Sequence, residues 1–142
     1  MATPSQEDYL EAIWRLTAEK GYARVSDIAA LLGVSRASVS KMTRRLHELG
    51  LLAVERYRGL TLTPQGRSQG LRLLRRHEIL EHFLHLLGVA DARLVWHDVE
   101  GIEHHVGPES LARIAALVAY AEAHPEWWAQ FRTGADGRAG PA

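Results

Sequence analysis

The 142-residue chain contains no cysteine, which excludes a disulfide framework and every metal site built from thiolate ligands. It also has no apolar run close to the roughly 20 residues that span a bilayer, and its start lacks the basic-then-apolar layout of a signal peptide. Net charge is absent too, because 17 Lys and Arg balance 17 Asp and Glu. We therefore expect a cytoplasmic protein of one compact domain or two small ones, with no membrane partner.

The charges that are present are unevenly distributed. Residues 1–75 hold 12 Lys or Arg against 7 Asp or Glu, whereas residues 76–142 hold 5 against 10. Seven of the eight histidines also fall in the second half. A basic first half is typical of a protein that binds a polyanion, and an acidic, histidine-rich second half suits a cation.

The segment at residues 98–105 carries the densest set of potential metal ligands. We expect a short helix here with Asp98 as its N-cap. Helical spacing would place Glu100, Glu103 and His104 on one face within about one turn. Carboxylates with an imidazole suit divalent ions such as Mn²⁺, Fe²⁺, Co²⁺ or Zn²⁺. The alternative is an ordinary amphipathic helix whose acids face water, and the pattern alone favours neither.

The first half of the sequence has the pattern of three helices. The first is expected over residues 4–20, with Thr3 as its N-cap. Two shorter helices follow, with Ser26 and Ser35 as their N-caps, and Gly33 makes the tight turn between them. This layout is typical of a helix-turn-helix, whose second helix enters the major groove of DNA.

A basic hairpin is expected after the helix-turn-helix. Residues 52–62 alternate apolar and polar side chains around a Tyr-Arg-Gly tip, which predicts two strands that form a wing. Cations and hydroxyls on the second helix and the wing would read base edges and hold phosphates, although each arginine taken singly is better explained as a solvated surface charge. The residues that we expect to contact DNA are Arg36, Ser38, Ser40, Lys41, Arg44, Arg45, Arg56 and Arg58.

The second half is predicted to be entirely helical. A long helix over residues 64–88 is apolar on more than one side, and His77 lies among its leucines, where a single histidine is more often a core residue than a ligand. Helices over residues 109–123 and from Pro125 add apolar surface that indicates a dimer. The predicted parts are a winged helix-turn-helix DNA-binding domain over 1–63, a connecting helix over 64–88, a helical dimerisation and metal-binding domain over 89–133 and a disordered tail over 134–142.

Over about residues 3–128 the sequence resembles the diphtheria toxin repressor (DtxR) family, and within it the short, manganese-responsive branch. The resemblance implies a mainly α fold and a homodimer that is not an enzyme. It also implies binding to operator DNA when the protein is loaded with metal, most simply as a repressor of genes for metal-uptake transporters. The segments that carry the resemblance run from Thr3 to Tyr9, Gly21 to Ala29, Tyr57 to Leu60, Arg76 to Glu78 and Asp98 to His105.

The resemblance also implies a binuclear metal site. Iron-responsive relatives carry Met and Cys at the positions of Asp8 and Glu100, and carboxylates in place of sulfur favour Mn²⁺, although Fe²⁺, Co²⁺, Zn²⁺ or Cd²⁺ are expected to substitute. The ligands come from the first helix, the long helix and the segment around residue 100. The implied ligands are Asp8, Glu11, His77, Glu100, Glu103 and His104.

Several alternatives compete with this interpretation. Taken alone, Asp8 and Glu11 are more simply explained by the favourable interaction of acids with a helix N-terminus. A binuclear site can activate water, so a small metalloenzyme is one alternative, although no nucleophile or substrate pocket is recognisable. A winged helix that responds to an organic ligand is another, and we expect no such ligand. A further hypothesis is that His97, His77 and Glu81 imitate the ancillary metal site of the iron-responsive relatives.

Overall fold

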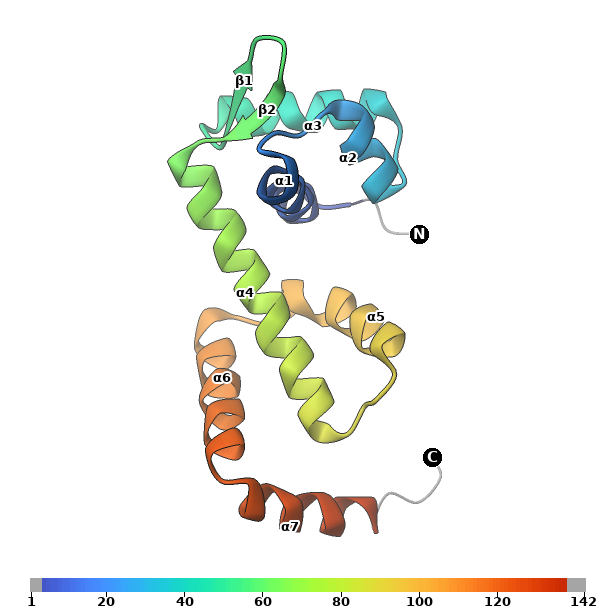
Figure 1. Cartoon of the computed structure of the whole chain (residues 1–142), viewed down its shortest axis with the longest axis vertical. Coiled ribbons are helices and arrows are strands. Elements are labelled where there is room, and N and C mark those ends of the chain that lie inside the picture. The colour runs from blue at the N-terminus through green and yellow to red at the C-terminus, as the bar shows by residue number, and fades with distance from the viewer. Residues whose placement is uncertain (1–3, 138–142) are drawn as a thin grey trace. The chain divides into compact units, whose positions relative to one another are not determined.

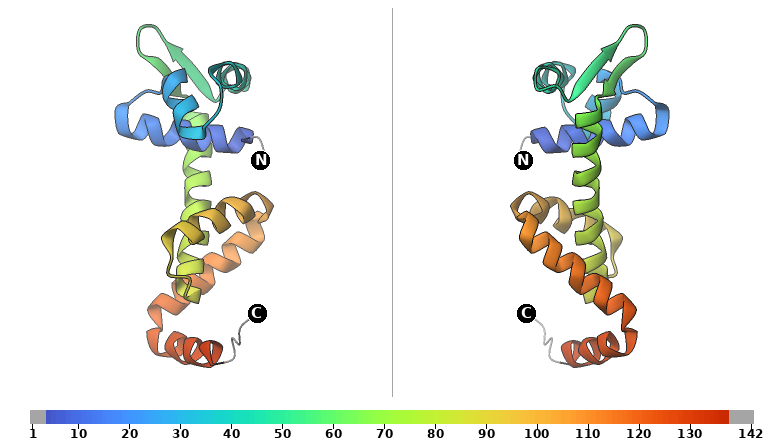
Figure 2. Two further views of the ribbon diagram at one scale, coloured as in Figure 1. Left: turned by 90° about the vertical axis from the view of Figure 1, so that its right-hand side faces the viewer. Right: turned by 90° about the vertical axis from the view of Figure 1, so that its left-hand side faces the viewer.

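The structure is a computed structural model that describes residues 4–137. Within that range seven α-helices, a 3-10 turn and one antiparallel hairpin follow one another along the chain (Figure 1). The chain forms two compact units that divide between Leu74 and Arg75. This division falls inside helix α4 (Pro64–Leu87), which Figures 1 and 2 show as continuous, whereas the predicted domain boundaries lie at the two ends of that helix. The mainly α fold with an N-terminal winged helix-turn-helix is confirmed.

The N-terminal unit begins with the helices α1 (Gln6–Lys20), α2 (Val25–Leu32) and α3 (Arg36–Glu48). The N-cap of α1 is Ser5, whose hydroxyl accepts a hydrogen bond from the backbone N–H of Asp8. The Asp8 carboxylate accepts one from the backbone N–H of Ser5 in return, which makes a capping box. The helix thus starts after Pro4, and the predicted cap, Thr3, lies outside the described residues.

The helix-turn-helix is confirmed, with one correction to its caps. Arg24 is the N-cap residue of α2, so Ser26, the predicted cap, lies inside the first turn. The cap of α3 is as predicted, because the Ser35 hydroxyl accepts a hydrogen bond from the Ser38 backbone at 3.1 Å. Gly33 ends α2 at φ 65°, a left-handed conformation that glycine adopts without steric cost.

The predicted wing is present as strands β1 (Leu52–Glu55) and β2 (Gly59–Leu62), which pair antiparallel with Leu52 opposite Leu62. Backbone hydrogen bonds of 2.8 Å in both directions join Ala23 to Leu60 and fasten the hairpin to the loop between α1 and α2.

The core of this unit draws on all three helices and the hairpin. Leu49, the residue that ends α3, is 47% exposed and is not part of this core. The fully buried aliphatic side chains include Ile13, Ile28, Val39, Leu46 and Leu52.

Helix α4 starts and ends where the sequence predicted, to within one residue. The Thr63 hydroxyl accepts a hydrogen bond from the Gly66 backbone at 3.1 Å and donates one to the Gly50 carbonyl at 2.6 Å. Gly66 has no room for a side chain, because a Cβ there would overlap the Leu51 carbonyl. The first turn of α4 therefore lies directly against the backbone between α3 and β1.

The C-terminal unit contains the second half of α4 followed by α5 (Ala92–Ile102), the 3-10 turn η1 (Glu103–His105), α6 (Pro108–Ala123) and α7 (Pro125–Asp136). The helix expected to begin at Asp98 begins earlier, because Asp91 is its N-cap and accepts a hydrogen bond from the Arg93 backbone at 2.9 Å. Buried Val95 and Val99, four residues apart, extend the apolar stripe toward the N-terminus of α5. Asp98 therefore lies inside the helix.

Helix α7 packs on the end of α4 through Trp128, whose indole N–H donates to the Leu86 carbonyl at 2.9 Å. The helix continues to Asp136, past the predicted start of the tail at Gly134, and the rest of that tail beyond residue 137 lies outside the described residues. Across residues 4–137, none of the helices has the length and hydropathy of a membrane span. The larger apolar side chains that this unit exposes are Leu87, Leu94, Trp96, Ile102, Leu117, Tyr120, Trp127 and Phe131.

Candidate metal centre and DNA interface

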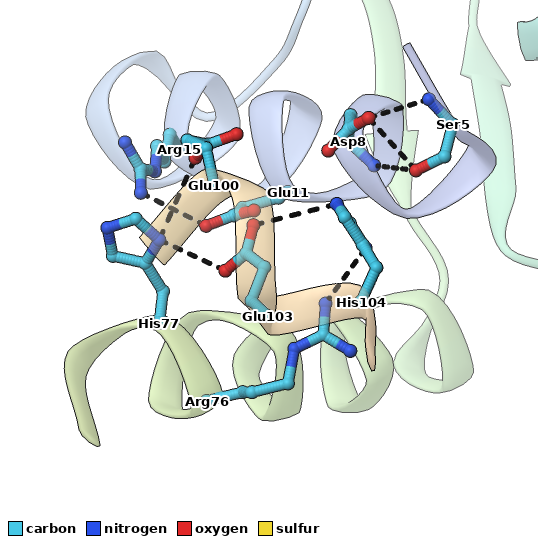
Figure 3. A network of polar contacts seen from close by, with 9 residues as sticks. All are labelled: Ser5, Asp8, Glu11, Arg15, Arg76, His77, Glu100, Glu103 and His104. Atoms are coloured by element: carbon cyan, nitrogen blue, oxygen red, sulfur yellow. Dashed lines mark hydrogen bonds and ion pairs between the residues drawn. The ribbon is translucent and has the colours of Figure 1, made fainter. Parts of the chain in front are cut away.

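Four of the six predicted metal ligands lie close together within the C-terminal unit (Figure 3). His77 projects from α4, Glu100 from α5, and Glu103 and His104 from η1. The His77 Nδ1 atom lies 3.1 Å from a carboxylate oxygen of Glu103 and 3.7 Å from one of Glu100. The Nε2 atom of His104 lies 3.7 Å from the other oxygen of Glu103. Glu103 is thus placed between two imidazoles.

The burial of Glu103 sets the chemistry of this group. Its side chain is 0% exposed, and its Oε1 atom accepts no hydrogen bond from any residue in the range 4–137. An ionised carboxylate in such a place is costly unless a cation compensates it. Two imidazoles and two carboxylates, with no thiolate available, form a donor set suited to a hard or borderline divalent cation. The residues of this unit therefore fit a divalent metal ion.

Helix α5 ends at Ile102 and is followed by the 3-10 turn η1, so the predicted regular helix does not run through all of these residues. Glu103 nevertheless keeps helical dihedrals, with φ −61° and ψ −33°, and its backbone N–H donates to the Val99 carbonyl as in an α-helix. The spacing argument still identified the residues, because Glu100 and Glu103 both contact the same side of His77.

Two neighbours of the ligands were missed from the sequence. The Trp96 ring lies 4.5 Å from the His77 ring, centroid to centroid. The Arg76 guanidinium lies 3.3 Å from His104 Nδ1. No regular spacing in the sequence points to Trp96 or Arg76, because each contact joins residues from different elements. Arg76 stands next to His77 in one of the segments that carry the family resemblance, which was the available hint.

The structure brings together two of the three residues of the hypothetical ancillary site, His77 and Glu81, and places His97 beside Asp98. The His97 side chain is 84% exposed and its Nδ1 atom lies 3.3 Å from the Asp98 carboxylate. His77, in contrast, is buried and lies 3.7 Å from Glu81 through its Nε2 atom. His97 and His77 therefore have different surroundings within this unit.

The two remaining predicted ligands belong to the N-terminal unit. The Asp8 carboxylate accepts hydrogen bonds from the Ser5 backbone at 2.6 Å and the Ser5 hydroxyl at 2.9 Å (Figure 3). Glu11 forms an ion pair of 3.1 Å with Arg15, one turn later on α1. Asp8 thus does perform the capping role that was its simpler explanation. That Asp8 and Glu11 also complete the metal centre stays a prediction.

The face of α3 that points away from the core, together with the wing, forms the candidate DNA interface. Val39 and Leu46 hold α3 against the core, which leaves cations and hydroxyls on its outer side. On the wing, Arg58 lies 3.7 Å from Glu55. All the residues predicted to contact DNA are exposed, namely Arg36, Ser38, Ser40, Lys41, Arg44, Arg45, Arg56 and Arg58.

Comparison with known proteins agrees with this division of roles. Residues 1–60 match the N-terminal DNA-binding domain of the iron-dependent repressors, and residues 63–127 match their metal-binding and dimerisation domain. The HTH-type transcriptional regulator MntR of Lysinibacillus sphaericus is 54% identical over 126 residues, which cover 89% of this chain and 90% of that protein.

Solved structures show the same fold. The T. acidophilum IdeR structure has a TM-score of 0.76 and 30% identity, covering 84% of this chain and 56% of that one. The structure of the manganese regulator SloR has a TM-score of 0.74 and 28% identity, covering 84% of this chain and 55% of that one. The chain thus spans just over half the length of these two solved chains. It belongs to the iron-dependent repressor family and is a metal-dependent, DNA-binding transcriptional regulator rather than an enzyme.

Proposed function

We propose that the protein is a manganese transport regulator: a cytoplasmic homodimer that binds operator DNA when loaded with Mn²⁺ and represses genes for metal-uptake transporters. The observation that carries the proposal is the contact of His77 and His104 with the buried carboxylate of Glu103, together with the Glu100 carboxylate 3.7 Å from His77. The relative named MntR and the manganese regulator SloR support the choice of metal.

The donor set supports Mn²⁺ over softer metals. Carboxylates at Asp8 and Glu100, where sulfur ligands would favour later metals, give a site rich in oxygen, which Mn²⁺ binds readily. Affinity alone does not select Mn²⁺ in the first-row series, so geometry and the number of bound ions must do so. Fe²⁺, Co²⁺, Zn²⁺ and Cd²⁺ are expected to bind the same residues. When bound, the ions supply the positive charge that offsets the clustered carboxylates.

The six ligands would couple metal to DNA because they come from both units. Asp8 and Glu11 lie on α1 of the N-terminal unit, and the other four lie in the C-terminal unit. Without metal, the carboxylates repel one another and leave the DNA-binding unit free to adopt many orientations. When metal ions join these carboxylates in one centre, the ligands restrict the DNA-binding unit to the orientation that binds DNA. The effect is limited by the difference in metal affinity between the two states.

A homodimer would turn this restriction into operator recognition. Two copies of α3 must meet successive major-groove faces, about 34–36 Å apart per helical turn. The exposed apolar side chains of α5, α6 and α7 support burial against a second copy of the chain. Arg36 would read a base edge, while Lys41 and the wing arginines would hold phosphates.

A DNA-binding titration tests the proposal. A labelled fragment from upstream of a candidate transporter gene is titrated with the protein in the presence of Mn²⁺, Fe²⁺, Co²⁺ or Zn²⁺, and in EDTA. We expect tight binding with Mn²⁺, weak binding in EDTA, and a dimer by light scattering in both conditions. Equal operator affinity in Mn²⁺ and EDTA, or a monomer on DNA, would contradict the proposal.

A further inference from the structure

Arg76 and His104 make a contact that the proposed function leaves unexplained. An Nη atom of Arg76 on α4 lies 3.3 Å from Nδ1 of His104 on η1. A guanidinium has only donors, so Nδ1 must be the acceptor in this hydrogen bond. A neutral imidazole carries one N–H, which then lies on Nε2, the atom that faces the buried Glu103 carboxylate at 3.7 Å. The contact thus selects one tautomer of His104.

This tautomer is the wrong one for a metal ligand. An imidazole that binds a metal through Nε2 carries its hydrogen on Nδ1 and donates it to a neighbouring acceptor. Arg76 offers no acceptor there, so two donors would face each other. An imidazole that binds through Nδ1 needs the lone pair that Arg76 already occupies. Either mode of ligation by His104 therefore breaks the hydrogen bond to Arg76.

The positive charge of Arg76 also disfavours metal binding by His104. The guanidinium brings a fixed positive charge to a ligand of the proposed metal centre, in a region where Glu100 and Glu103 otherwise supply negative charge. A divalent cation bound by the same imidazole is repelled by that charge. The cost is smaller once the Arg76 side chain moves away from His104.

We propose that Arg76 is a latch that holds His104 in a form that does not bind metal, and so lowers the affinity of the centre. This inference rests on the proposed function, in which His104 is a ligand. A regulator that switches on only when metal is plentiful needs an affinity well below the maximum that its ligands allow. Arg76 thus sets the metal concentration at which the regulator is activated, without contributing a ligand atom.

The substitution Arg76→Gln tests the latch. The glutamine side chain has no charge, and its amide oxygen accepts a hydrogen bond from Nδ1–H, which permits the metal-binding tautomer. Arg75→Gln is the matched control, because it removes the same charge from the adjacent, exposed position of the same helix. Calorimetric titration with Mn²⁺ should show affinity about tenfold higher for Arg76→Gln, the factor expected for losing a hydrogen bond to a charged group. Arg75→Gln should bind as the unaltered protein does.

Nitrogen-15 NMR of the imidazole ring gives a readout that needs neither metal nor a variant. In the unaltered, metal-free protein the His104 hydrogen should lie on Nε2, whereas in Arg76→Gln the fraction with the hydrogen on Nδ1 should increase. A hydrogen on Nδ1 in the unaltered protein would overturn the latch even if the variant failed to fold. So would an Arg76→Gln variant that binds Mn²⁺ no more tightly, or an equal gain in Arg75→Gln. Failure of the unaltered protein to bind Mn²⁺ would instead overturn the proposed function, and the latch with it.

Discussion

His77 and Glu103 lie 26 positions apart in the sequence, yet Nδ1 of the first is 3.1 Å from a carboxylate oxygen of the second, and both side chains are buried. The second oxygen of Glu103 faces His104. Glu103 therefore connects His77 on α4 with His104 on η1. A change at Glu103 should affect metal binding more than a change at any single neighbour in this unit.

The substitution Glu103→Gln should separate metal binding from folding. The amide has nearly the same shape but no charge, so the metal-free variant should unfold at the same or a higher temperature than the unaltered protein. Stabilisation by Mn²⁺ should disappear. For the unaltered protein it amounts to about 2.7 kcal/mol when the free ion is at 100 times its Kd. Calorimetric unfolding with and without Mn²⁺ measures both effects.

Glu122→Gln is the matched control for this experiment. Glu122 lies in the same unit, and its exposed side chain is 3.9 Å from His82. This variant should keep the full stabilisation by Mn²⁺. If Glu103→Gln keeps it as well, Glu103 is not a metal ligand.

Much of the fold could be predicted because its signals are local. Ser35 as a cap, Gly33 as a turn and the start of α4 at residue 64 each depend on a few neighbouring residues, and all three are present in the structure. The alternation around the Tyr57 tip likewise identified the hairpin. Patterns of this kind need no knowledge of distant contacts.

The errors arose where local signals competed or where distant residues decide. Asp91 and Asp98 are both acceptable N-caps, and the structure shows that the helix starts at the first, where the Asp91 carboxylate accepts hydrogen bonds from the first turn. The 3-10 turn at Glu103 has no distinct sequence signature. The contact of Arg76 with His104 joins positions 28 residues apart, so no periodicity reveals it.

Asp8→Met should weaken activation by Mn²⁺ and relax the preference toward Fe²⁺. The thioether replaces a hard oxygen donor with a soft sulfur, which reduces the advantage of Mn²⁺. Operator binding measured against free Mn²⁺ and free Fe²⁺ should show the Mn²⁺ midpoint rising at least tenfold while the Fe²⁺ midpoint rises less. Mn²⁺-dependent binding that stays intact would count against Asp8 as a ligand.

The capping role of Asp8 requires its own control. Ser5→Ala removes the hydroxyl that Asp8 contacts at 2.9 Å, but it leaves the carboxylate in place. This variant should lose about 1 kcal/mol of stability, the usual effect of a missing N-cap, and keep its response to Mn²⁺. A loss of response in Ser5→Ala would assign the effect of Asp8→Met to the helix cap.

Arg36→Ala and Lys41→Ala should weaken DNA binding in different ways. Arg36 is the first residue of α3, where a guanidinium is placed to read a base edge, so its loss should cost about 1–3 kcal/mol on the operator and much less on random DNA. Lys41 should act through phosphate, so its loss should reduce both affinities and lower the slope of log K against log salt by about 1. Anisotropy titrations at several salt concentrations distinguish the two. Arg36→Ala weakening all sequences equally would refute its base-reading role.

Tyr57 at the tip of the wing should lower the free energy of unfolding and strengthen binding to DNA. Its φ of 71° is left-handed, which costs a non-glycine residue about 1–2 kcal/mol, and its side chain is 89% exposed, so burial does not offset that cost. The Arg56 guanidinium lies 5.3 Å from the centre of the Tyr57 ring, and this cation–π contact favours one position of the arginine side chain. Tyr57→Asn, with a residue that tolerates this conformation, should therefore raise the unfolding free energy by about 0.5–1 kcal/mol and weaken operator binding several-fold. Tyr57→Phe keeps the ring and should change neither quantity. A loss of stability in Tyr57→Asn, or an unchanged operator affinity, would contradict the expectation that the Tyr57 ring favours DNA binding at the expense of stability.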